Sequence, residues 1–135
     1  MTDNFHDDED RAGATVLWLP QTIELLQQFR TFNPDVTANQ IITFLLVANK
    51  PGINNKAILS ALGLSDGGQS RTISALSKHG DKRAAGRQGK PGWDVIDSIE
   101  DEADRRYKVN TLNKRGKILL DRLNRIMTGN QGTAK

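Results

Sequence analysis

Five hydrogen-bonding or cationic residues recur at three- and four-residue steps in the segment QSRTISALSKHG. In a helix this spacing places them on one face, and that face contains no acidic residue. The residues are Ser70, Arg71, Ser74, Ser77 and Lys78. A guanidinium such as that of Arg71 can bind O6 and N7 of guanine, and hydroxyl groups can donate to phosphates or base edges. We therefore expect this face to contact duplex DNA; the alternative is a polar face that touches only water.

Two more groups of cations follow this helix. The first belongs to a Gly-rich loop over residues 81–92, and its members are Lys82, Arg83, Arg87 and Lys90. The second, Arg105 and Arg106, ends the acidic turn EDEADRR. The formal net charge of +3 understates this basicity, because the first ten residues hold five acids and no Lys or Arg. A basic remainder suits a polyanionic partner, while the alternative for Arg105 and Arg106 is local neutralisation of the acidic turn.

A helix-turn-helix pattern contains the polar face. The apolar helix QIITFLLVAN ends at a Lys-Pro-Gly sequence, and its apolar residues fall all round it, which predicts a buried helix. A short helix, NKAILSALG, follows, and residues 65–68 are predicted to turn into the polar-faced helix. Asp35 or Thr37 can cap the first of these helices, and Asn54 or Asn55 can cap the second. Such a motif positions its last helix for the major groove.

Two segments rich in β-forming residues, 93–99 and 107–112, flank the acidic turn and predict the strands of a β-wing. Asn113 can cap a closing helix with a wide apolar stripe, and Pro20 suits the first turn of an N-terminal helix. The predicted fold class is therefore mainly α (α+β). It is a winged helix-turn-helix with a two- to three-stranded β-wing and flanking N- and C-terminal helices.

One domain over residues 15–127 is expected from the length of 135 residues. Residues 1–14 are predicted to be a disordered acidic tail, and residues 128–135 a disordered end. The chain has no cysteine, which excludes disulfides, thiolate zinc sites and thiol catalysis. It has neither an apolar run long enough for a membrane span nor a signal-peptide core, so we expect no membrane partner and a cytoplasmic location.

Residues that could support catalysis or bind a metal are few and poorly placed. His6 falls in the acidic tail and His79 at a helix end, and no phosphate-binding GxxxxGK[ST] sequence occurs. The acidic turn could attract Ca²⁺ or Mg²⁺, but it lacks the ligand order and central glycine of an EF-hand. We therefore expect no enzymatic activity, no catalytic residue, no metal site and no cofactor.

Three stretches together resemble the MarR family of winged-helix transcription regulators. They are QIITFLLVANKPGINNKAILSALGLS, QSRTISAL, and DEADRR followed by a strand and LNKRG. The resemblance implies a dimer whose recognition helices enter successive major grooves. By position it implies a recognition face of Ser70, Arg71, Thr72, Ser74 and Lys78. It also implies a wing-tip pair in which Asp104 orients Arg105 or Arg106 toward the minor groove.

The sequence therefore predicts a sequence-specific double-stranded DNA-binding transcription regulator, acting as a repressor dimer that occludes a promoter. The homodimer is expected because apolar stripes on the first and last helices exceed what one small domain covers. These stripes comprise Leu25, Leu26, Phe29, Leu119, Leu123, Ile126 and Met127.

Other functions remain open at this point. One alternative is a winged-helix protein-interaction module whose acidic wing and tail bind a basic partner, such as RNA polymerase, with weak DNA affinity. A single-strand-binding role is disfavoured by the small number of aromatic residues. A small-molecule effector is compatible with the resemblance.

Overall fold

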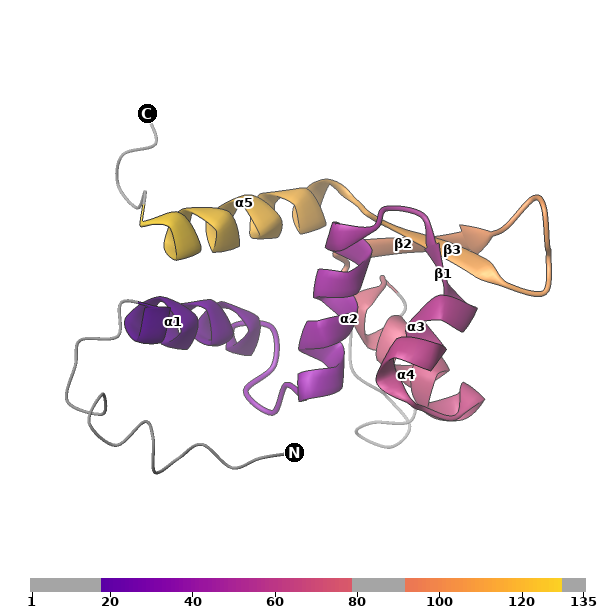
Figure 1. Ribbon diagram of the computed structural model, residues 1–135, viewed down its shortest axis with the longest axis horizontal. Helices are drawn as coiled ribbons and strands as arrows, with labels where there is room; N and C mark the ends of the chain where they lie inside the picture. The colour runs from indigo at the N-terminus through magenta and orange to yellow at the C-terminus, as the bar shows by residue number, and fades with distance from the viewer. Residues whose placement is uncertain (1–17, 79–91, 130–135) are drawn as a thin grey trace, which may run out of the picture.

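The computed structural model describes residues 18–78 and 92–129. Within these ranges the chain forms five helices and a three-stranded antiparallel sheet (Figure 1). In chain order the elements are α1 (Trp18–Arg30), α2 (Ala38–Asn49), β1 (Ile53–Asn54), α3 (Asn55–Leu62), α4 (Asp66–Leu76), β2 (Ile96–Glu100), β3 (Lys108–Leu112) and α5 (Lys114–Thr128). The predicted mainly α (α+β) winged helix-turn-helix is confirmed. α1 and α5 lie together at one end of the molecule, and the wing projects at the other (Figure 1).

Local caps explain where the helices of the helix-turn-helix begin. Thr37, rather than Asp35, caps α2: its hydroxyl accepts from the N–H of Gln40 at 3.1 Å, and the Gln40 side chain accepts from the N–H of Thr37 at 3.1 Å. Asn54, rather than Asn55, caps α3, with Oδ1 accepting from a backbone N–H at 2.8 Å. The two alternatives left open by the sequence are thereby resolved.

The turn predicted at residues 65–68 is wrong in extent, because α4 already begins at Asp66. Gly63 ends α3 in the left-handed region, with φ of 65°, and its N–H donates to the carbonyl of Leu59. Since Gly63 reverses the chain there, the two glycines that follow Asp66 are not needed for the turn. They extend α4 at its N-terminal end instead.

The sheet has the order β1-β3-β2, so β3 is central and β2 lies at an edge. In the register Ser98 lies opposite Asn110, and Asn110 also lies opposite Ile53. The very short β1 comes directly before α3 and attaches the wing to the helix-turn-helix. The predicted two- to three-stranded wing therefore has three strands, and the third comes from residues that the sequence did not assign to it.

The strand predicted from residue 93 begins only at Ile96. Residues 93–95 bond instead to the end of α4, where the N–H of Val95 donates to the carbonyl of Leu76 at 2.9 Å. Asp94 has φ of 57°, which a strand residue does not adopt. The β-forming composition of this segment thus reflects burial of Trp93 and Val95, not strand pairing.

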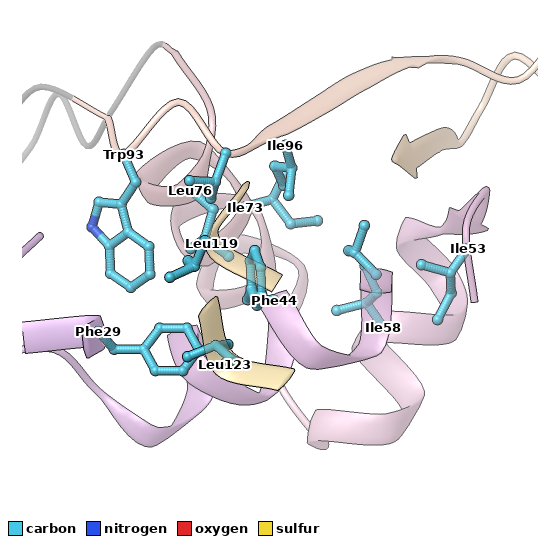
Figure 2. Packing of buried hydrophobic residues seen from close by; sticks show 12 residues of the cluster. Phe29, Phe44, Ile53, Ile58, Ile73, Leu76, Trp93, Ile96, Leu119 and Leu123 are labelled. Atoms are coloured by element: carbon cyan, nitrogen blue, oxygen red, sulfur yellow. The ribbon is translucent and has the colours of Figure 1, made fainter. Parts of the chain in front are cut away.

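The core lies where α1, α2, α5 and the segment before β2 meet (Figure 2). The ring of Phe29 packs edge-on against Phe44 with centroids 5.5 Å apart, and it is tilted against Trp93 at 6.2 Å. Phe32 stacks on Trp93 at 5.1 Å. Leu119 of α5 completes this cluster, so the aromatic residues join both terminal helices to the rest of the domain.

Most of the apolar residues in the stripes on α1 and α5 are buried within one chain, which corrects the expectation that a monomer exposes them. Phe29, Leu119, Leu123 and Ile126 are all buried, because α1 packs along α5.

The prediction that α2 is buried all round is also wrong. Its residues Ile42 and Leu45 are exposed, because α3, α4 and β3 pack against its other side.

Gly116 should be indispensable to the fold. A Cβ at this position would overlap the carbonyl oxygen of Val95, and backbone cannot move away as a flexible side chain can. Gly116→Ala should lower the free energy of unfolding by about 3 kcal/mol, although the same change in an exposed helix is usually stabilising. At Gly63 a Cβ meets no atom within 4 Å, so Gly63→Ala should cost only about 1 kcal/mol of left-handed strain. Urea unfolding of both variants tests this, and equal losses would contradict it.

Candidate nucleic-acid interface

The helix predicted to enter the major groove is α4. Arg71 is exposed on it, and Ser74 and Thr72 are half-buried. Lys78 is exposed just after the helix ends at Leu76. Ser70 belongs to α4, but its side chain lies outside the described residues. The described side chains of this face thus offer two cations and hydroxyl groups.

Ser77 does not belong to the exposed face, as its spacing had suggested. It is only 6% exposed, and its Oγ donates to the carbonyl of Ser74 at 2.9 Å. The reason is that α4 ends one residue earlier, and the segment before β2 closes over this end. The N–H of Asp94 donates to the carbonyl of Ser77 at 3.4 Å. The recognition face is therefore narrower than predicted.

At the wing tip, Arg106 is the arginine that pairs with Asp104. Its Nε and a terminal nitrogen donate to the two carboxylate oxygens at 3.0 and 2.9 Å, and its backbone N–H donates at 3.2 Å. The hydrogen bond from Arg106 lowers the pKa of Asp104, and the same bond raises the pKa of Arg106. Arg105 is exposed beside the pair. The bidentate contact fixes the direction of one guanidinium on an otherwise acidic turn.

Tyr107 and Lys56 are two further residues at the wing tip that sequence reasoning missed. The Arg106 guanidinium carbon lies 5.6 Å from the centroid of the Tyr107 ring, and the Lys56 Nζ lies 5.8 Å from it. Lys56 belongs to α3, and its charge contributes to the lowered pKa of Asp104. The tyrosine ring therefore lies between the wing tip and the helix-turn-helix. No spacing in the sequence links these residues, because they meet only through folding.

Asn110 joins the base of the wing to α3. Its side chain is fully buried, and Nδ2 donates to the carbonyl of Ile53 at 3.0 Å and to Oδ1 of Asn55 at 2.8 Å. A buried amide with both donors used is costly to displace. The wing is thus attached to α3 at its base through Asn110 and near its tip through Tyr107.

Several predicted residues lie outside the described part of the chain. These are the basic-loop residues Lys82, Arg83, Arg87 and Lys90, together with His6 and His79. Among the described residues, no group of three or more His, Cys, Asp or Glu side chains is arranged to hold a metal ion. None of the helices in residues 18–78 and 92–129 has the length and apolar character to cross a membrane.

Comparison with known proteins places this geometry in a structural class. No protein-family model and no curated protein matches the chain. The transcriptional regulator Tm0710 from Thermotoga maritima is 13% identical and has a TM-score of 0.62, over 84% of this chain and 68% of that one. A SlyA-like transcription regulator from Listeria monocytogenes is 17% identical, with a TM-score of 0.55 over 99% and 75%. A mutant of S. aureus MepR bound to an oligodeoxyribonucleotide is 20% identical, with a TM-score of 0.54 over 87% and 78%.

The chain has the MarR-type winged-helix fold. In this MarR-type fold the described residues predicted to face DNA lie in two separate places, one on α4 and directly after it and the other at the wing tip. They are Arg71, Thr72, Ser74, Lys78, Arg105 and Arg106, with Asp104 beside them. Their contact with DNA stays a prediction.

The wing-tip pair makes a testable prediction about proton binding. The pKa of Asp104 is lowered in the folded protein. Ionised Asp104 should therefore contribute fully to the stability of the folded state above the ordinary aspartate pKa. This contribution should be lost as the pH falls through the lowered value. A carboxyl carbon NMR titration should therefore give Asp104 a midpoint below that of an unpaired aspartate. Arg106→Gln should raise this midpoint, and Arg105→Gln should leave it nearly unchanged. Equal midpoints in both variants would mean that the pair does not form in solution.

Proposed function

We propose that this protein is a sequence-specific duplex-DNA-binding transcription regulator that acts as a repressor. The observation that carries the proposal is the exposed face formed by α4 and the residues directly after it, whose described side chains include Arg71 and Lys78 and no carboxylate. It lies on the same molecule as a wing that holds Arg106 in a fixed orientation. Solved structures of the same fold support the proposal, since MepR was solved with an oligodeoxyribonucleotide and AbfR was solved bound to DNA.

α4 and the wing would contact different grooves of the duplex. α4 would enter the major groove, where Arg71 can donate two hydrogen bonds to one guanine. The hydroxyl groups of Thr72 and Ser74 would donate hydrogen bonds to phosphates or base edges. Arg106 would reach the minor groove beside it, in the orientation that Asp104 sets. Repression would follow from occlusion of a promoter, which requires binding and no chemical step.

The alternative function, a protein-interaction module based on the acidic wing, gains no comparable support. One of the wing carboxylates, Asp104, is already engaged by Arg106. The fold neighbours are transcription regulators, which favours a regulator over an enzyme. A small-molecule effector stays a prediction.

Replacement of Arg71 tests the recognition face. Arg71→Ala should weaken binding to the selected site by about 1–3 kcal/mol and relax the preference at one base position. The fold should be unaffected, because Arg71 is exposed. The site is first selected from random duplexes, and affinities are then measured by mobility shift. Arg122→Ala is a suitable control, because this exposed arginine lies on α5, away from the interface. Unchanged affinity and preference for Arg71→Ala would contradict the assignment of α4.

The proposal includes a homodimer, but the surface that forms it differs from the one predicted. Since Phe29 and the inner residues of α5 are buried within the chain, the apolar residues left exposed on α1 carry the argument. Leu19, Ile23 and Leu26 recur at four- and three-residue steps and form one exposed stripe, with Ile23 56% exposed. A two-fold dimer would cover this stripe and present two copies of α4 to one duplex.

Sedimentation across a dilution series, without DNA, tests the dimer. The wild type should sediment as a dimer at micromolar concentration, whereas Ile23→Asp should shift the equilibrium toward the monomer because a charge is costly to bury at an interface. Ile99→Asp is the matched control: Ile99 is 63% exposed, but it lies on the wing. A wild type that remains near 14.9 kDa at high micromolar concentration would remove the preformed dimer.

A further inference from the structure

Two buried side-chain oxygen atoms in the sheet have no hydrogen-bond partner in the part of the chain that the structure describes. They are Oδ1 of Asn110 on β3 and Oγ of Ser98 on β2. In the register Ser98 lies directly opposite Asn110. Directly opposite residues of an antiparallel pair project from the same face, with Cβ atoms about 4.5–5.5 Å apart. The two oxygen atoms therefore belong to one small region between the strands.

The orientation of the Asn110 amide is set by its amino group. Nδ2 donates to the carbonyl of Ile53 at 3.0 Å, and because a carbonyl can only accept, a reversed amide would bring two acceptors together. Nδ2 also donates to Oδ1 of Asn55 at 2.8 Å. Ile53 belongs to β1 and Asn55 to α3, and the sheet has the order β1-β3-β2. The amide oxygen is thus left on the side of β2, where Ser98 lies.

Water is the group that suits these two oxygen atoms. A buried oxygen without a partner is destabilising, and folded proteins satisfy such atoms with other protein groups or with ordered water. A buried water needs roughly two to four polar partners. The Ser98 hydroxyl can donate or accept, and Oδ1 of Asn110 accepts. A cleft of about 480 Å³ between α4 and the wing is lined by Asn55 and Ser98, so solvent lies close to this point.

The contacts of Asn110 lie between α3 and the tip of the wing. β1 contributes only two residues to the sheet, so its backbone pairing with β3 is a short attachment. Asn55, which accepts from Asn110, is the first residue of α3, and Lys56 follows it. Lys56 lies over the Tyr107 ring, and the Arg106 guanidinium lies over the same ring. A movement of β3 relative to α3 would therefore displace Tyr107 and Arg106 together.

We propose that one buried water molecule joins Ser98 to Asn110, and that this bridge makes Asn110 a positioning residue for Arg106. The inference rests on the proposed function and extends it to residues that neither the sequence nor the comparisons assigned. The water donates to Oδ1 of Asn110 and forms a second hydrogen bond with the Ser98 hydroxyl. With both ends of its amide engaged, Asn110 holds β3 against β2 on one side and α3 on the other. Arg106 then reaches the duplex at a fixed distance from α4.

A crystal structure of the full chain, at a resolution that shows ordered water, tests the bridge without DNA. The wild type should show a water within hydrogen-bond distance of both oxygen atoms. In Ser98→Ala this water should be absent, because it would keep a single partner. A direct hydrogen bond between Ser98 and Asn110, or a water that persists in Ser98→Ala, would overturn the bridge. Ser98 is the residue to replace, since loss of Asn110 would also remove its bonds to Ile53 and Asn55.

A double-mutant cycle tests the positioning role. Ser98→Ala should weaken binding to the selected duplex about fivefold, within the range of coupling between residues of one network. In an Arg106→Ala background it should cause no further loss, because the side chain that it positions is gone. In an Arg71→Ala background the fivefold loss should persist, because Arg71 lies on α4.

The control for the cycle is Thr111→Val, which replaces an exposed hydroxyl-bearing residue on β3 and should leave affinity unchanged in every background. Ser98→Thr keeps a hydroxyl at position 98 and should bind like the wild type. All affinities are measured well below the unfolding midpoint of each variant, so that a loss of stability does not alter the folded fraction.

The outcomes separate this inference from the function on which it rests. If the wild type binds no duplex, the proposed function itself fails, whatever the crystal structure shows of the water. If the wild type binds and Arg71→Ala weakens it, the function stands. In that case, a Ser98→Ala loss that is absent, or equal in the Arg71→Ala and Arg106→Ala backgrounds, overturns the positioning role alone. A loss that vanishes only in the Arg106→Ala background supports it.

Discussion

The close approach of α5 to residues 93–95 is the contact on which the arrangement of α4, the wing and the terminal helices depends. The Val95 carbonyl accepts from the N–H of Asn113, and the Val95 N–H donates to the last residue of α4. The Asn113 side chain also donates to the carbonyl and a carboxylate oxygen of Asp94 at 2.9 and 3.0 Å. Only a glycine at position 116 allows this approach. One short segment thereby fixes the end of α4, the start of β2 and the start of α5 together.

A wing that is fixed at its root can still change direction at its tip, and two contacts with α3 restrict this freedom. Asn110 bonds to Asn55 at the base, and Tyr107 lies near Lys56 further out. These contacts also account for how a turn rich in acids can present a cation. Asp104 is neutralised by Arg106, whose guanidinium lies near the Tyr107 ring. The charge of the wing tip is therefore set by pairing and orientation more than by composition.

Each terminal helix packs one apolar side into the core and leaves other apolar residues exposed, and the sequence does not distinguish the two sets. The inner side of α1, with Phe29, belongs to the core, whereas the stripe around Ile23 faces outward. α5 is similar: Leu119 and Leu123 face the core, and Ile118 is exposed. A helix that is apolar over a wide arc can pack within its own chain and still offer a surface to a second copy. The distribution of burial decides which apolar residues remain for an interface.

The sequence by itself determined the order of the helices and of the two longer strands, most of the helix ends and the fold class, because these depend on local chemistry. Apolar periodicity, the caps at Thr37, Asn54 and Asn113, and a left-handed glycine at position 63 act over a few residues. Only the tertiary structure decided that Trp93 enters the core instead of a strand, and that Ser77 is buried. It also decided that a cleft opens between α4 and the wing. Each of these depends on segments far apart in the chain, and a pattern of neighbouring residues carries no information about which distant backbone will cover them.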